Sequence, residues 1–274
     1  MNYRFSHTTT LIGKLIMVAG MLPAPHASAQ SKAEPLTFEV ASVKPGDPDV
    51  RPRGGGPVSG GGLRIVCMPL KWIIMFAYDM NEFQVSGGPA WIESQGFDIV
   101  AKAPGAAASE TRLPTAEEHR QARLRLQALL AERFQLVVRR ETKDTQVYAL
   151  LIAKNGFKMK ASAGESRGLR QSESGEMTGI ATRMEILTKV LSRVIGHPVL
   201  DKTGLTGSYD FTLKFAPELT GGGLEKPGSG VGTLDMAAPS IFTALQEQLG
   251  LKLESQKAPA EFIVIERVAR PTPN

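Results

Sequence analysis

The sequence predicts an α+β protein made of two similar halves. Apolar residues make up 42% of the 274 residues and charged residues 22%, which is ordinary globular composition and excludes disordered, collagen-like and coiled-coil chains. Apolar residues follow helical spacing in some segments and strand spacing in others. The same succession of spacings occurs twice. We therefore expect two tandem βαββαββ-type modules, each a small mixed sheet covered by two helices.

The repeat is clearest where a helix runs into the following strands. Two sets of five apolar residues share the spacings 4, 2, 2 and 9, and they lie 115 positions apart. The sets are Leu130, Phe134, Leu136, Val138, Val147 and Leu245, Leu249, Leu251, Leu253, Phe262. A spacing of four is typical of a helix and a spacing of two of a strand, so each set predicts helix, strand, turn, strand. Together with two further matches at nearly the same offset, this indicates a tandem duplication.

The first 29 residues have the features of a secretory signal peptide. Arg4 and Lys14 supply positive charge, an apolar stretch runs from Leu11 to Leu22, and an Ala-Ser-Ala cleavage sequence ends at Ala29. The expected domains are therefore a signal peptide (1–29), a first α+β module (30–153) and a second one (154–274). The mature chain would be periplasmic or extracellular, and its formal net charge would fall from +5 to +3. No apolar run reaches eighteen residues, so no transmembrane span is expected after cleavage.

Start and stop signals define the helices in chain order. Pro69 begins a helix that ends near Tyr78 and carries Trp72 on its expected core face. Thr115 with Glu118, and Thr182 with Glu185, have the spacing of capping boxes. The second of these helices should stop at Gly196 and Pro198. Ser240 should cap the last helix, which Gly250 ends.

The strands are expected where residues alternate or are wholly apolar. They span 37–44, 63–67, 97–102, 135–141 and 146–153 in the first half, and 209–215, 251–255 and 261–268 in the second. Loops rich in Gly, Pro and Ser are expected at 45–62, 104–114, 162–176 and 217–239.

The segment 182–268 resembles the short N-terminal domain of secretins and TonB-dependent receptors. The order of its parts carries the resemblance: an amphipathic helix, a short strand around Val199, a strand from Tyr209 to Phe215, the helix 241–249 and a closing strand at Phe262. The resemblance implies a receptor-like interaction or signalling module.

The mature chain also resembles a Soli_cterm-like family of exported proteins of unknown function that is numerous in acidobacteria. The matching strings are Phe38 to Lys44, Gly88 to Ile92 and Asp201 to Phe211. This family sometimes forms the C-terminal part of membrane metallopeptidase sensors. The resemblance implies export and a shared architecture but no reaction, and the chain has no His-Glu-x-x-His sequence.

The sequence offers little recognisable catalytic chemistry. One cysteine excludes a disulfide framework and a Cys-x-x-Cys pair, and we expect Cys67 to be a buried thiol. His119 is expected in solvent and His197 at a helix C-terminus. No nucleophile elbow or metal-spaced histidine pair is present, so we expect no metal and no cofactor. The weak, dispersed charge argues against nucleic acid.

Two stretches remain as candidate binding sites. Trp91 follows a turn containing Gly88 and Pro89, and it either pins this loop to the core or serves as an exposed anchor for a partner. The second stretch contains Asp201, Tyr209 and Asp210. Asp201 opens a tetrapeptide identical to the phosphorylated motif of cation-pumping ATPases, but a tight turn is the simpler interpretation.

Two functions follow from these observations. The first is a non-enzymatic extracytoplasmic module that binds a protein partner in the cell envelope, because small sheets offer edge strands that accept a partner's strand. The alternative is an exported enzyme with a carboxylate-based site between the modules, formed by residues such as Asp98, Asp201 and Asp210. The two differ in whether these carboxylates meet in one cleft.

Overall fold

The α+β class is confirmed, and the strands of the described residues form three four-stranded sheets. The computed structural model describes residues 36–47, 49–105, 114–164, 168–172, 175–216 and 238–271. The predicted signal peptide, 1–29, and most of the predicted loop 217–239 lie outside the described residues. Within the described part of the chain, no helix is long and apolar enough to cross a membrane.

The first sheet is antiparallel throughout. Its order is β1 (Val40–Pro45), β5 (Gly96–Lys102), β3 (Gly62–Pro69) and β2 (Gly54–Val58). On β5 the side chains of Phe97, Ile99 and Ala101 are buried while Val100 is 52% exposed, as expected for a strand with one face on a core. This sheet was expected to be mixed, so that part of the prediction was wrong.

Two helices and three short elements complete the first core. Helix α1 (Leu70–Tyr78) follows β3 directly. The next elements are η1 (Glu82–Gln84), β4 (Val85–Gly87) and α2 (Trp91–Ser94). Helix α3 (Ala116–Arg133) begins with the predicted capping box, in which the Thr115 side chain accepts from the Glu118 N–H.

The second sheet has the corresponding order and is also antiparallel. It consists of β7 (Lys160–Ser162), β11 (Ser208–Lys214), β9 (Glu176–Arg183) and β8 (Gly168–Gln171). Helix α4 (Met184–Ile195) follows β9 and ends at Gly196. Gly196 has a φ of 72°, a left-handed conformation that glycine adopts easily because it has no Cβ. The helix α5 (Ile241–Ala244) continues as a π-helical turn, η2 (Leu245–Leu249), and is capped by Ser240 as predicted.

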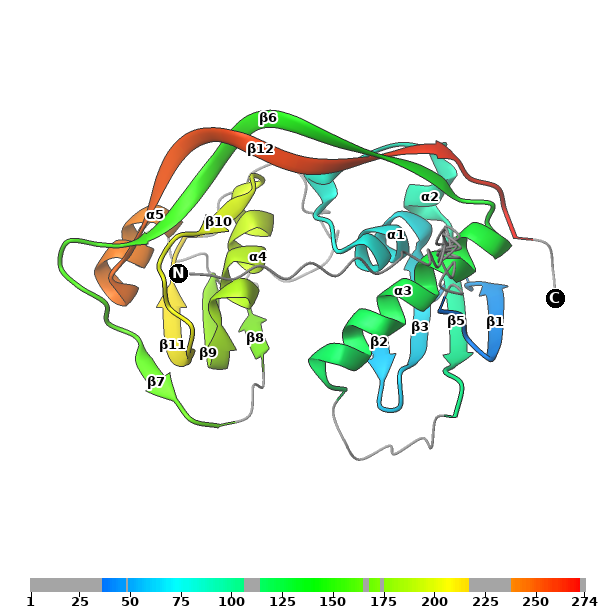
Figure 1. Cartoon of the computed structure of the whole chain (residues 1–274), viewed down its shortest axis with the longest axis horizontal. Helices are drawn as coiled ribbons and strands as arrows, with labels where there is room; N and C mark the ends of the chain where they lie inside the picture. Colours follow the sequence, from blue (N-terminus) through cyan, green and yellow to red (C-terminus); the bar gives the residue numbers. More distant parts are fainter. Residues whose placement is uncertain are drawn as a thin grey trace, which may run out of the picture. The chain divides into compact units, whose positions relative to one another are not determined.

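A third, mixed sheet joins the two cores. Its order is β10 (Val199–Asp201), β6 (Val137–Ile152), β12 (Leu251–Arg267) and β4. Figure 1 shows β6 and β12 as one long two-stranded ribbon, paired antiparallel from Leu251 with Ile152 to Arg267 with Val137. The ribbon supplies Ile263 and Ile265 to the first core, and Leu150 and Leu251 to the second.

Three local predictions were wrong. A turn was expected inside each of β6 and β12, around Asp144 and Pro259, but these two residues pair with each other and the strands continue. The proposed capping box at Thr182 does not form, because the hydroxyl of this buried residue donates to the Gly168 carbonyl at 2.8 Å. Trp72, expected in the core, is 46% exposed.

Candidate functional site

The loop that carries Trp91 is held against the first core. The Trp91 ring meets Phe97 edge-on with centroids 6.3 Å apart, and the Arg270 guanidinium lies 4.9 Å from the Trp91 ring centroid. Trp91 is half-buried, whereas Gly88 and Pro89 are exposed. The Trp91 side chain therefore has intramolecular partners on two sides, as expected for a residue that fixes its loop.

Glycine is required where this loop approaches β12. Gly87 has a φ of +80°, and a Cβ added there would lie 2.7 Å from the Ile265 carbonyl oxygen. Gly88 has the same φ, and its Cβ would lie 2.8 Å from a terminal methyl of Ile92. Both glycines thus have a packing role in the pairing of β4 with β12.

Asp210 supports a β-bulge. Its Oδ1 accepts the Ala181 N–H at 2.7 Å, where Ala181 is fully buried and has a positive φ of 47°. Asp98 makes the same contact in the first sheet, accepting the Cys67 N–H at 2.7 Å where Cys67 has a φ of 51°. Neighbouring Tyr209 is buried and packs edge-on against Phe157. Asp98 and Asp210 thus stabilise strained backbone at one bulge in each of the two sheets.

Asp201 organises a turn at the surface. Its Oδ1 accepts the Thr203 N–H at 2.9 Å and the Thr203 hydroxyl at 2.7 Å, and Gly204 takes a φ of +72° in the same turn. Asp98, Asp201 and Asp210 lie on β5, β10 and β11, which belong to three different sheets. The structure therefore gives no geometric support to a shared carboxylate site.

The remaining titratable candidates also have local surroundings. Cys67 is a buried free thiol whose Sγ donates to the carbonyls of Val50 and Asp47, and burial raises its pKa, with smaller contributions from Asp98 and Asp47. Partial burial lowers the pKa of His119, and the charge of Arg123 lowers it further. Among the described residues, no cluster of three or more His, Cys, Asp or Glu side chains could hold a metal ion.

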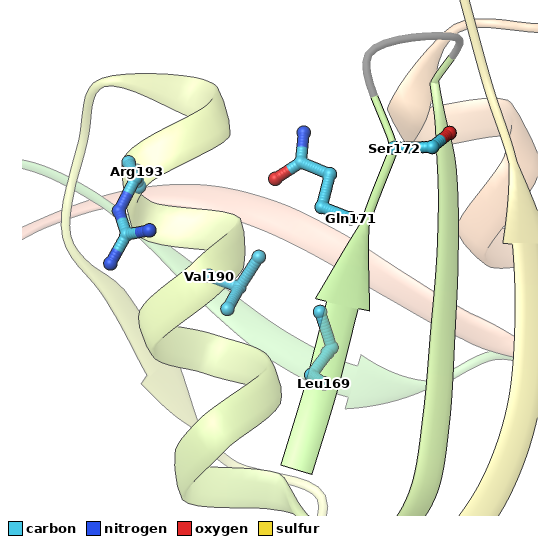
Figure 2. A pocket seen from close by; sticks show the side chains of 5 residues that line it. All are labelled: Leu169, Gln171, Ser172, Val190 and Arg193. Carbon is cyan, nitrogen blue, oxygen red and sulfur yellow. The ribbon is translucent and has the colours of Figure 1, made fainter. Parts of the chain in front are cut away.

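A cavity of about 420 Å³ lies between β8 and α4. We call it the β8–α4 cavity; its lining residues are Leu169, Gln171, Ser172, Val190 and Arg193. Figure 2 shows Leu169 and Val190 facing each other from the strand and the helix, with the Gln171 amide nearer to the strand end that leads to Ser172. Leu169 and Val190 are half-buried and pack against the second core, whereas Gln171 and Arg193 are exposed. The cavity thus combines an apolar floor with a polar and cationic rim.

Local spacing explains how these side chains converge. Leu169 and Gln171 are two residues apart on β8, so they point to the same face of the strand. Val190 and Arg193 are three residues apart on α4, so they lie on neighbouring turns of one helix face. Sequence reasoning missed this site because it assigned 162–176 to a loop. The available signal for a strand was the two-residue spacing of Leu169 and Gln171, in a segment bounded by Gly168 and Gly175.

The comparison with known protein families identifies a family whose model covers most of the chain. Residues 71–268 match the model of a family described as Protein of unknown function (DUF3738). No curated protein and no solved structure matches the chain.

Proposed function

The chain belongs to the DUF3738 family of proteins of unknown function, and we propose that it is an extracytoplasmic binding module that holds a segment of a partner protein in the β8–α4 cavity. The observation that carries this proposal is the cavity itself, in which the half-buried side chains of Leu169 and Val190 lie beside the polar side chains of Gln171, Ser172 and Arg193. Its volume accommodates a few side chains, which suits a peptide segment.

The edge position of β8 supports the proposal. β8 ends its sheet, and its pairing with β9 joins Gly168 to Ile180 and Arg170 to Thr178. Ser172, two residues further along, donates its N–H to the Glu176 carbonyl, so the N–H and C=O groups of Leu169 and Gln171 point away from β9. These outward groups offer a partner hydrogen bonds beside the cavity.

We also propose that the protein is exported, on the strength of the signal-like residues 1–29. A partner would then be a protein of the cell envelope. The test is mass spectrometry of the N-terminal peptide of the chain, recovered separately from the periplasmic and cytoplasmic fractions of an expressing bacterium. We expect it to start at Gln30, and a chain that keeps Met1 and stays in the cytoplasm would refute export.

We propose further that the two halves arose by duplication. The sheet orders β1-β5-β3-β2 and β7-β11-β9-β8 correspond strand by strand. Three positions with positive φ recur at an offset of 114: Gly54 and Gly168, Gly61 and Gly175, and Cys67 and Ala181. If the halves are equivalent, replacing Asp98 or Asp210 by Ala should destabilise the protein similarly, and a cost at only one of them would count against duplication.

The binding function can be tested by peptide selection. Random 16-residue peptides displayed on phage would be selected on the chain from residue 30 onwards, and selected peptides would be measured by fluorescence anisotropy. Val190→Asp should weaken their binding at least ~10-fold, because a charge then sits on the apolar floor. Arg193→Glu, at an exposed position, provides a second probe that spares the core.

Ile180→Asp is the matched control for this experiment. Ile180 is 45% exposed on β9, and it alternates with the buried Gly179 and Ala181, so it faces away from the core. Peptides should bind this variant as they bind the parent. The proposal fails if no peptide is enriched, or if the enriched peptides bind parent, Val190→Asp and Arg193→Glu equally.

A further inference from the structure

The first sheet has a buried face and an exposed face. Helices α1 and α3 pack on the buried face, where Ile65, Phe97 and Ile99 belong to the first core (Figure 1). The side chains of the opposite face alternate with these along the strands. We call this opposite side the outer face of the first sheet. Its large exposed side chains are Val40, Val58, Val100, Lys44, Arg64 and Lys102.

The strand register brings the three valines of the outer face into one apolar band. Val40 faces Lys102 across β1 and β5, so Val100, two residues before Lys102, is a diagonal neighbour of Val40. Val58 faces Gly62, and a Cβ at Gly62 would lie 2.9 Å from a Val58 methyl, so Val58 lies over this glycine. The exposed fractions of Val40, Val100 and Val58 are 60%, 52% and 41%. Exposed aliphatic surface therefore extends across the sheet from β1 to β2.

Three cations adjoin this apolar band, and none of them forms an ion pair with a described residue. Arg64 and Lys102 lie directly beside two of the valines on neighbouring strands, and Lys44 lies near the end of β1. Asp98 is a carboxylate of the same face, but its Oδ1 accepts the Cys67 N–H at 2.7 Å. The outer face thus combines exposed apolar groups with an excess of positive charge.

The corresponding positions of the second sheet are polar. Counting from the two matched bulges, Arg64 and Val100 are replaced there by Thr178 and Thr212, which face each other in the same register. A lysine recurs two residues beyond Thr212, but it forms an ion pair with Glu176 at 3.4 Å. Because the two sheets share one strand order, this architecture does not itself require valines and unpaired cations on an outer face.

We propose that the outer face of the first sheet docks on the surface of an anionic phospholipid bilayer. On such a surface, cations attract the headgroups while adjoining apolar side chains enter the boundary beneath them. The face consists of valine, glycine and lysine, whereas aromatic residues and methionine are enriched in protein–protein interfaces and lysine is depleted. A second copy is disfavoured, because a two-fold contact would place these cations against one another. The proposed surface is separate from the β8–α4 cavity, which belongs to the second sheet.

Vesicle flotation tests this docking. The chain from residue 30 keeps all three described sheets and lacks the apolar stretch 11–22, which would be a competing contact with lipid. It is mixed with vesicles of equal parts phosphatidylglycerol and phosphatidylcholine, or of phosphatidylcholine alone. We expect it to float with the anionic vesicles, and less so at high salt, because salt screens exposed cations. Equal recovery with both kinds of vesicle, or none with the anionic ones, overturns the proposal.

Matched variants at exposed positions locate the contact. Arg64→Gln should lower partitioning into the anionic vesicles about five-fold, the contribution of one cation near a charged bilayer. Arg170→Gln removes an exposed cation of the second sheet and should leave partitioning unchanged. Val100→Asp should abolish flotation, whereas Thr212→Asp, at the equivalent position of the second sheet, should not. Equal losses within either pair, in variants that circular dichroism shows to be folded, overturn the assignment of the face.

A soluble polyanion distinguishes lipid from an acidic protein as the partner. Labelled poly-glutamate is titrated with the same chain and followed by fluorescence anisotropy. If the chain ignores vesicles but binds poly-glutamate, and Arg64→Gln weakens that binding, the face serves an acidic protein and the assignment to lipid is wrong. Peptide selection tests the binding function of the β8–α4 cavity independently of either result.

Discussion

Replacing Asp210 by Ala should destabilise the protein by about 2–3 kcal/mol. The substitution leaves the N–H of Ala181 without its carboxylate acceptor at a fully buried position, and hydrogen bonds to charged groups contribute about 1.5–3 kcal/mol. The bond also holds Ala181 at a φ of 47°, which the side chain of an L-residue disfavours. Asp210→Asn keeps an acceptor oxygen and should cost less than half as much.

The assay is thermal unfolding of the chain from residue 30, followed by circular dichroism. For a chain of this size each kcal/mol corresponds to about 2–4 °C, so Asp210→Ala should lower Tm by roughly 5–10 °C. Asp98→Ala, which frees the Cys67 N–H, should behave alike. Asp201→Ala is the control: its carboxylate serves an exposed turn, and its loss should cost only about 0.5–1 kcal/mol.

An Asp210→Ala protein that melts at or above the parent temperature would refute this reasoning. Active-site residues are often retained at a cost to stability, so a stabilised variant would instead revive an enzymatic role for Asp210. The same outcome at Asp98 would remove the common structural role that we assign to the two carboxylates.

Three further outcomes are expected. Leu245→Ala, at a fully buried position of the second core, should cost about 2–5 kcal/mol in urea titration, whereas Leu124→Ala on the exposed side of α3 should cost under about 1 kcal/mol; equal costs would contradict the assigned core. Native Cys67 should react with a disulfide reagent at pH 8 far more slowly than the denatured chain, because it is buried and its pKa is raised; rapid labelling of the folded protein would show an accessible thiol. The pKa of His119 is lower in the folded protein than in the unfolded chain, so the unfolded chain binds a proton at His119 first as pH falls below about 6.5. The free energy of unfolding should therefore decrease from that pH down to the pKa of His119 in the folded protein. His119→Gln should flatten this dependence of stability on pH, and an unchanged dependence would exclude His119 as its source.

Helix ends and core strands were predictable because local chemistry determines them. Thr115 and Ser240 accept N–H groups that a helix start leaves free, and Gly196 and Gly250 adopt the left-handed conformation that ends a helix. Cys67 was expected as a buried thiol and is one. These features depend on a few neighbouring residues, so the sequence alone was sufficient.

Features that depend on distant pairing were not predictable. Asp144 and Pro259 favour turns locally, but each lies opposite the other in the β6–β12 ladder, and the paired backbone keeps both strands continuous. Trp72 lies two residues from both Leu70 and Ile74, which is about 200° around the helix from each of them. Because Leu70 and Ile74 are buried, the side chain of Trp72 faces solvent. Asp98, Asp201 and Asp210 could be chosen from the sequence as candidate carboxylates. Only the arrangement of the sheets shows that each accepts backbone N–H groups in a different sheet or turn.

The β8–α4 cavity was missed for a related reason. β8 contains only Gly168 to Gln171, and its strand character comes from pairing with β9 instead of from a strong apolar alternation. The helical half of the site, α4, was predicted. Val190 and Arg193 could be identified as lining residues only once the position of β8 beside α4 was known.

Hydrogen–deuterium exchange with a selected peptide tests the binding function most directly. On addition of the peptide, amides of residues 168–172 on β8 and of the α4 turn containing Val190 and Arg193 should exchange more slowly. The corresponding strand β2, residues 54–58, serves as an internal reference because α3 already lies against it, and its exchange should not change. Slowed exchange on β2 or elsewhere, with β8 and α4 unaffected, would contradict the assignment of the binding site.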